Sequence, residues 1–210
     1  MIFVGLDLET SGIDHDRSVP IEFGLAIPTP DGVQQLAQYN YRIGGWKWDD
    51  DYTWATRWMH ETWAWNYRSG EVHKIPKVAL EGLRTVEEVD VLIRLILDDH
   101  QSPTRSDKAV YCMMGWNVAG FDRPFVQKHM PLTFERFSYR TIDLNAICYA
   151  LAEPNVRSYD TIKNRAKQYA ADKVGGPEMQ HQAGWDAATA YYAYLYLRDL
   201  VRQGDKVEWM

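Results

Sequence analysis

The order of strand-like and helix-like segments is the feature of this 210-residue chain that most constrains its fold. Three segments of strand length come first, separated by short turn-rich stretches: 2–8, 19–27 and 35–43. Further strands are expected at 108–116 and 137–144, and helices at 86–99, 122–130, 143–152, 159–171 and 184–202. Thr85 and Glu88 form a capping-box signature at the start of the first of these helices. We therefore expect an α/β domain with a mixed central sheet, three antiparallel strands followed by parallel strands, flanked by helices.

Length and composition favour a single domain over residues 1–210, because a hydrophobic content of 46% can supply one sizeable core. The first residues lack a basic leader, and no uncharged stretch is long enough to span a bilayer, so we expect no membrane association. Cys112 and Cys148 lie in apolar segments without metal-ligand spacing. They are expected to be buried thiols, which favours a cytoplasmic location.

The net charge of -6 argues against a broad basic face that would bind duplex nucleic acid. It does not exclude a nuclease, because an active site built of carboxylates is itself negative. Aromatic residues make up 13% of the chain and include nine Trp, and single strands can be bound by stacking on aromatic rings.

Two carboxylates lie on the first predicted strand, in "GLDLET". Asp7 and Glu9 are two residues apart, so they share one face of the strand, whereas Leu6 and Leu8 take the other face. In an apolar strand the two carboxylates would repel each other and lose hydration, and a divalent cation would relieve both effects. The alternative is a solvated strand end.

Two more acidic residues stand at predicted helix starts. Asp122 shares a helical face with apolar residues, and Asp186 heads an apolar stripe that continues through Ala190, Ala193, Leu197 and Leu200. A carboxylate on a buried face needs a hydrogen-bond donor, a basic side chain or a metal ion. Helix capping is the alternative for both, and it is the only role expected for Asp143. His181 precedes Gly184 and is expected on a loop, near Asp186 but free to move.

Together these residues match the requirements of two-metal phosphodiester hydrolysis. The four carboxylates can hold two divalent ions, Mg²⁺ or Mn²⁺, and a nearby imidazole can accept a proton from the attacking water. Both ions would also stabilise negative charge on the leaving oxygen.

The segments "GLDLETSGID", "GWNVAGFD" and "HQAGWDAA" resemble the three motifs of the DEDD superfamily of 3′ to 5′ exonucleases, in its histidine-containing branch. The resemblance covers most of the chain and implies a ribonuclease H-like fold. By this resemblance, Asp7, Glu9, Asp122 and Asp186 are metal ligands and His181 is the general base. The backbone around Thr10 and Ser11 would hold the 3′ hydroxyl of the terminal nucleotide.

Within the superfamily, "NVAGFDRPFVQKHMP" followed by "FSYRTIDLNAI" is similar to oligoribonuclease, with Asn117 among the matching positions. Small phage and mycobacterial exoribonucleases carry similar Trp-containing segments. The resemblance implies hydrolysis of RNA or short oligoribonucleotides at 3′ ends, with release of nucleoside 5′-monophosphates. The alternatives are a proofreading or repair DNA exonuclease, an inactive module that binds nucleic acid or protein, and a structural α/β domain with capping acids.

The segment 44–84 contains six Trp and is expected to be an insertion in the domain. Several of its aromatic residues fall on helical stripes, which favours core packing; a base-stacking surface is the alternative. The candidates for stacking on terminal bases, or for wedging beside them, are Trp58, Met59 and Trp63. An exposed part of this segment would also suit a homodimer interface.

Overall fold

The computed structural model describes residues 1–29, 35–46, 48–49, 63–64, 73, 75, 77–100, 111–152, 158–176 and 179–203. Its centre is a five-stranded sheet made of β1 (Ile2–Thr10), β2 (Pro20–Pro28), β3 (Leu36–Arg42), β6 (Tyr111–Gly115) and β7 (Phe137–Asp143). The spatial order is β3-β2-β1-β6-β7. The pairs β1–β2 and β2–β3 are antiparallel, and β1–β6 and β6–β7 are parallel. The predicted mixed sheet is therefore confirmed.

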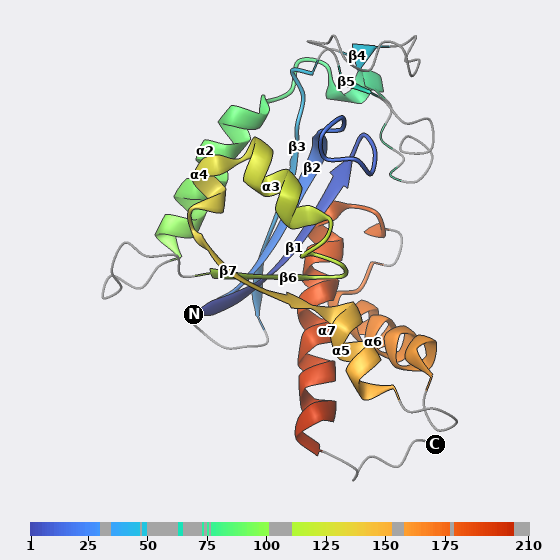
Figure 1. The fold of residues 1–210 in the computed structure, drawn as a ribbon. Coiled ribbons are helices and arrows are strands. Elements are labelled where there is room, and N and C mark those ends of the chain that lie inside the picture. Colours follow the sequence, from blue (N-terminus) through green and yellow to red (C-terminus); the bar gives the residue numbers. More distant parts are fainter. Residues whose placement is uncertain are drawn as a thin grey trace.

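The helices cover both faces of this sheet (Figure 1). They are α2 (Val86–Asp99), α3 (Asp122–His129), α4 (Pro131–Phe134), α5 (Leu144–Leu151), α6 (Tyr159–Val174) and α7 (Ala183–Gln203), and a 3₁₀ helix, η2, spans Lys77–Leu80. The five predicted helices agree with the structure to within three residues at each end, whereas α4 was not predicted. The capping box is present: the Thr85 N–H donates to Glu88 Oε2 at 2.8 Å, and the Glu88 N–H donates to Thr85 Oγ1 at 3.4 Å.

The Trp-rich segment is described only in part. Two short strands, β4 (Trp48–Asp49) and β5 (Trp63–Ala64), form a parallel pair. The helical expectation is therefore wrong at Trp63, where pairing with β4 places an aromatic residue in the extended backbone that such side chains favour. Trp58 and Met59 lie outside the described residues.

The sheet separates two apolar clusters. Leu6 and Leu8 of β1 are buried against α2 and α3, in a cluster that also contains Val89, Ile93 and Phe125. On the opposite side of the sheet, α7 packs on β1 and β2. Helices α5 and α6 also pack against α7. The expected stripe on α7 is buried, including Ala190, Ala193, Leu197 and Leu200.

Two glycines allow α7 to lie directly on the strands. A Cβ atom at Gly5 would overlap the carbonyl oxygen of Ala187, and a Cβ atom at Gly24 would overlap that of Ala183. Any side chain at these two positions would therefore push the first turns of α7 away from the sheet. The backbone of α7 therefore lies against the backbones of β1 and β2 at Ala187 and Ala183, on either side of Asp186 in the sequence.

Cys112 and Cys148 are both buried free thiols, as predicted. Burial raises the pKa of Cys148 to about 11. None of the helices in the described part of the chain is long and apolar enough to cross a membrane.

Candidate active site

Asp7 and Glu9 lie on the face of β1 that α7 covers. The strand alternation puts them on the same side as Gly5, which contacts Ala187 of α7, and opposite Leu6 and Leu8 in the core. Glu9 is buried, and Asp7 is partly exposed. The solvated strand end is therefore excluded for Glu9.

Asp122 is held at β1 by a long-range hydrogen bond. β6 pairs with β1 only as far as Gly5, and beyond that point the Leu8 N–H donates to Asp122 Oδ1 at 2.9 Å. Asp122 is only 2% exposed. The capping alternative is wrong here, because Phe121 is the N-cap residue of α3 and no side chain caps that helix.

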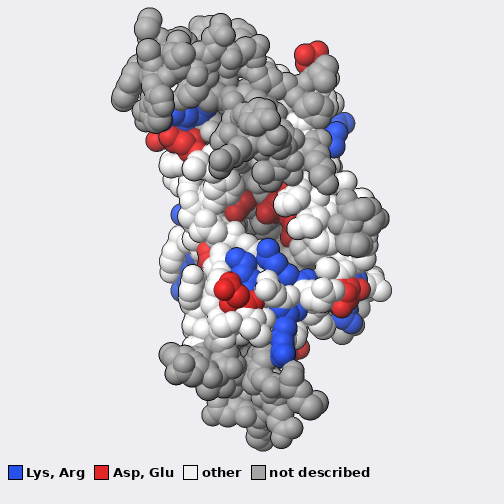
Figure 2. All heavy atoms as spheres, turned by 90° about the vertical axis from the view of Figure 1, so that its right-hand side faces the viewer, with Lys and Arg blue, Asp and Glu red and all other residues white. Residues whose placement is uncertain are grey.

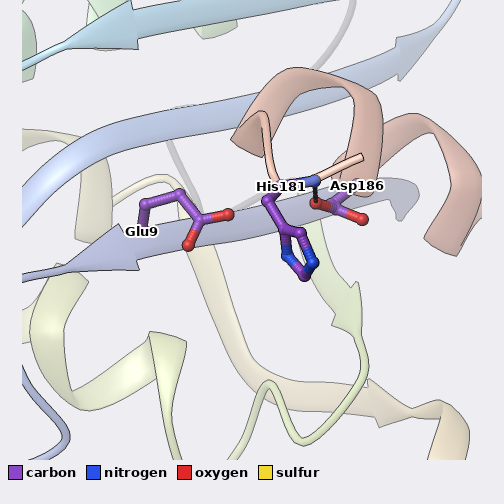
Figure 3. A group of neighbouring side chains, drawn as sticks. All are labelled: Glu9, His181 and Asp186. Carbon is purple, nitrogen blue, oxygen red and sulfur yellow. Dashed lines mark hydrogen bonds between the residues drawn. The ribbon is translucent and has the colours of Figure 1, made fainter. Parts of the chain in front are cut away.

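Asp186 does not cap α7 either, because residues of the neighbouring strands take that role. The buried Glu22 of β2 accepts a hydrogen bond from the Ala183 N–H at 2.9 Å. Asn40 of β3 accepts one from the Gly184 N–H at 2.7 Å. The carboxylate of Asp186 is thus left to face Glu9 and His181 (Figure 3). Sequence analysis did not identify Glu22 or Asn40 as positioning residues.

His181 approaches the site from the turn before α7. Its N–H donates to Asp186 Oδ2 at 2.9 Å, and its backbone has a φ of 67°, a left-handed conformation that is uncommon outside glycine. His181 thus precedes α7 in a turn, as expected, and a hydrogen bond links its backbone to Asp186. One ligand atom each from Glu9, His181 and Asp186 lies within 4.8 Å of the others, so these three residues can hold a metal ion together (Figure 3).

The electrostatics of the site reflect the convergence of its carboxylates. Burial raises the pKa of Asp7 well above its usual range, and the charges of Asp122, Glu9 and Asp186 raise it further. Burial also raises the pKa of Asp122 to about 8 and that of Asp186 to about 7, with Glu9 adding to both shifts. Figure 2 shows acidic side chains recessed in a hollow of the surface that faces the viewer. Without a cation, the carboxyl groups of Asp7, Asp122 and Asp186 therefore hold their protons to a higher pH than ordinary aspartates do.

A second histidine lies at the site that sequence analysis did not identify. His73 Nδ1 contacts Oε2 of Glu9, and its side chain is only 15% exposed. The contact joins residues 64 positions apart, and His73 stands in the Trp-rich segment without a motif around it. No sequence signal pointed to it.

Of the candidate substrate-binding residues, Thr10, Ser11 and Asn117 lie at two turns, one after β1 and one after β6. The Thr10 hydroxyl donates to the Gly12 carbonyl at 2.7 Å, and Ser11 Oγ accepts from the Val19 N–H at 3.1 Å, so both side chains stabilise the turn after β1. Asn117 is exposed after β6 and also has a left-handed backbone, with a φ of 63°. Of Trp63, only the strand backbone is described.

No family model and no curated protein matches the chain. Among solved structures, it is similar to the zinc-bound form of the E. coli ExoI–ssDNA complex, with a TM-score of 0.60 and 15% sequence identity. The alignment covers 96% of this chain and 40% of that one. The fold is ribonuclease H-like. The structural similarity confirms the predicted fold. The chain spans less than half the length of that neighbour.

Proposed function

We propose that the protein is a metal-dependent 3′ to 5′ exonuclease of the DEDD superfamily, in its histidine-containing branch. Its substrate would be single-stranded nucleic acid, RNA or short oligoribonucleotides first, and its products nucleoside 5′-monophosphates. The observation that carries this proposal is the convergence of Asp7, Asp122 and Asp186 beside the buried Glu9. The order of the motifs and the fold shared with ExoI support the same conclusion.

The cluster fits a divalent metal. Its carboxyl groups have raised pKa values because they are buried together, and oxygen ligands of this kind suit Mg²⁺ or Mn²⁺. Asp7, Glu9, Asp122 and Asp186 would hold two ions. Bound there, the ions would lower the pKa of a water molecule and stabilise negative charge on the leaving oxygen.

His181 would act as the general base. Its imidazole stands beside Glu9 and Asp186, within reach of a water on the cluster. The water oxygen forms a bond to the phosphorus of the last phosphodiester, the bond from phosphorus to the 3′ oxygen of the preceding nucleotide breaks, and the imidazole takes the proton of the water. The hydrogen bond from the His181 N–H to Asp186 fixes the backbone from which the imidazole acts.

A digestion experiment tests the proposed activity. Single-stranded RNA and DNA oligomers labelled at the 5′ end, incubated with Mg²⁺ or Mn²⁺, should shorten one nucleotide at a time from the 3′ end. EDTA should abolish the reaction, and Asp7→Asn should do the same, because that residue interacts with three other carboxylates of the cluster. An intact oligomer under all metal conditions would refute the enzyme and favour the inactive binding module.

DNA is the second candidate substrate, because the structural neighbour was determined with single-stranded DNA. The RNA and DNA arms of the digestion separate the two candidates by their relative rates. A homodimer through the Trp-rich segment and a cytoplasmic location also stay predictions.

His73→Ala should weaken Mn²⁺ binding by roughly 10- to 100-fold, the usual effect of removing a group that orients a metal ligand. The reason is its contact with Oε2 of Glu9, which orients that carboxylate in the site. Metal titrations followed by melting temperature measure the change. His15→Ala is the matched control, since His15 is half-exposed and pairs with Asp16. Equal affinities in the two variants would show that the His73 contact does not position Glu9.

A further inference from the structure

A pocket of about 450 Å³ opens beside the carboxylate cluster, between α6, α7 and the residue that follows β6. This volume lies within the usual range of small-ligand sites. Its lining includes Trp116, Lys167, Gln168, Gln180, Trp185 and Asp186. Asp186 therefore belongs both to the pocket and to the candidate active site.

The walls of the pocket offer aromatic surface in a fixed position. Trp116 and Trp185 are both partly buried, and the Trp185 indole N–H donates to the Gly175 carbonyl at 2.7 Å, which holds that ring in place. Any of the nucleobases can stack on an indole ring, so such a contact does not depend on the sequence of the strand. Gln180 adds an amide donor and acceptor that suit the edge of a base, whereas the Gln168 amide already donates to Asp172 Oδ1 at 2.8 Å.

Two lysines from successive turns of α6 lie against the same ring. Lys163 Nζ is 5.4 Å and Lys167 Nζ 5.5 Å from the centroid of Trp116. The Lys163 ammonium also donates to the Tyr159 hydroxyl at 3.0 Å, whereas within the described residues Lys167 has no hydrogen bond or ion pair. Burial and the charge of Lys163 lower the pKa of Lys167. An anion beside both ammonium groups would offset their repulsion.

We propose that this pocket binds one nucleotide of the substrate strand, with its base on the indole surface and its phosphate at Lys167. The inference rests on the proposed nuclease function, because the shared Asp186 places a phosphate bound here next to the carboxylate cluster. Lys167 and Asp186 line the same pocket, so the lysine lies near one end of the carboxylate cluster. In Figure 2, Lys and Arg side chains gather along one edge of the hollow that holds the acidic residues.

The test is calorimetric titration of the 210-residue protein with adenosine 5′-monophosphate and with ribose 5-phosphate, in Mg²⁺. Lys167→Gln should weaken binding of both ligands by roughly tenfold or more, since it removes a charged partner of the phosphate. Trp116→Leu should weaken only the nucleotide, by about 5- to 150-fold, so that the two ligands bind almost equally. Trp116→Phe keeps a ring and should retain most of the preference for the nucleotide. Lys173→Gln is the matched control, because Lys173 lies on the same helix over Tyr169 and away from the pocket.

Wild-type affinities that are equal for the two ligands, or that none of the pocket variants changes, would overturn the proposal. Digestion of labelled oligomers by the same preparations keeps this result separate from the proposed function. Normal digestion by the Lys167 and Trp116 variants, with unchanged nucleotide binding, would refute the pocket and leave the nuclease standing. Absent digestion by the wild type, with nucleotide binding that depends on Trp116, would support the pocket and refute the nuclease.

Discussion

His181→Asn should lower the turnover number on single-stranded oligomers by roughly 10²- to 10⁴-fold, the usual contribution of a general base. Asparagine is the informative substitution because it tolerates the left-handed backbone that His181 adopts, whereas alanine would add strain. The N–H that bonds to Asp186 is also retained, so the turn before α7 should keep its conformation. Single-turnover rates with labelled oligomers measure the loss.

The metal response of the same variants separates a base from a ligand. Mn²⁺ should raise the melting temperature of His181→Asn as much as that of the wild type, because an ion that binds only the folded state stabilises it by mass action. Asp186→Asn should lose both the metal response and the turnover. If His181→Asn loses its Mn²⁺ response as well, the imidazole is a ligand, as its distance to Glu9 and Asp186 would allow. Near-normal turnover would end its assignment as the base.

Asp122→Asn should make the metal-free protein more stable than the wild type at pH 8. The pKa of Asp122 is raised to about 8 from a usual value of 3.8, so between these values the folded state holds a proton that the unfolded state has released. Folding stability of the wild type must therefore fall as pH rises through this window, and Asp186, with a pKa of about 7, acts in the same direction. The asparagine carbonyl can still accept from the Leu8 N–H. The gain at pH 8 should be on the order of a few kcal/mol.

Thermal melts in EDTA at pH 5, 6, 7 and 8 measure this difference. The melting temperature of the wild type should decline toward pH 8 and that of Asp122→Asn should decline less, with a separation of roughly 5 °C or more at the upper end. Adding Mn²⁺ should restore the wild type more strongly at pH 8 than at pH 6, because carboxylates must lose their protons to bind a metal. Asp160→Asn is the matched control, since it changes an exposed aspartate in the first turn of α6. Parallel curves for Asp122→Asn and wild type would contradict the raised pKa.

The two helix-start aspartates show what the sequence can and cannot predict. Asp143 caps α5 as expected, accepting from the N–H groups of Asn145 and Ala146. Asp122 stands in a similar local context, yet its partner is the Leu8 N–H, 114 positions away in the chain. Local sequence favours the cap in both cases. Only the end of the β1–β6 pairing at Gly5 leaves room for a carboxylate from α3.

The strands and the five long helices were predictable because their apolar periods are regular. The same apolar periods predicted that Asp7, Glu9 and Asp186 lie on inward faces. The order of the motifs led to the hypothesis that these carboxylates form one metal site. The contact between His73 and Glu9 was not predictable, because it joins the Trp-rich segment to β1 without a pattern at either end. Nor did the sequence show that Glu22 and Asn40 would cap α7, since each reaches the helix from a neighbouring strand.

The direct contact of α7 with the glycines of β1 and β2 also determines when the candidate site can form during synthesis. Asp7 and Glu9 are made first, but the cluster is incomplete until residues 181–203 have been added and the first turn of α7 has docked against Gly5 and Gly24. A nascent chain that has reached Asp122 holds three carboxylates without the fourth and without His181. The proposed nuclease activity would therefore arise only after α7 has docked, and growing chains would not cleave the nucleic acids around them.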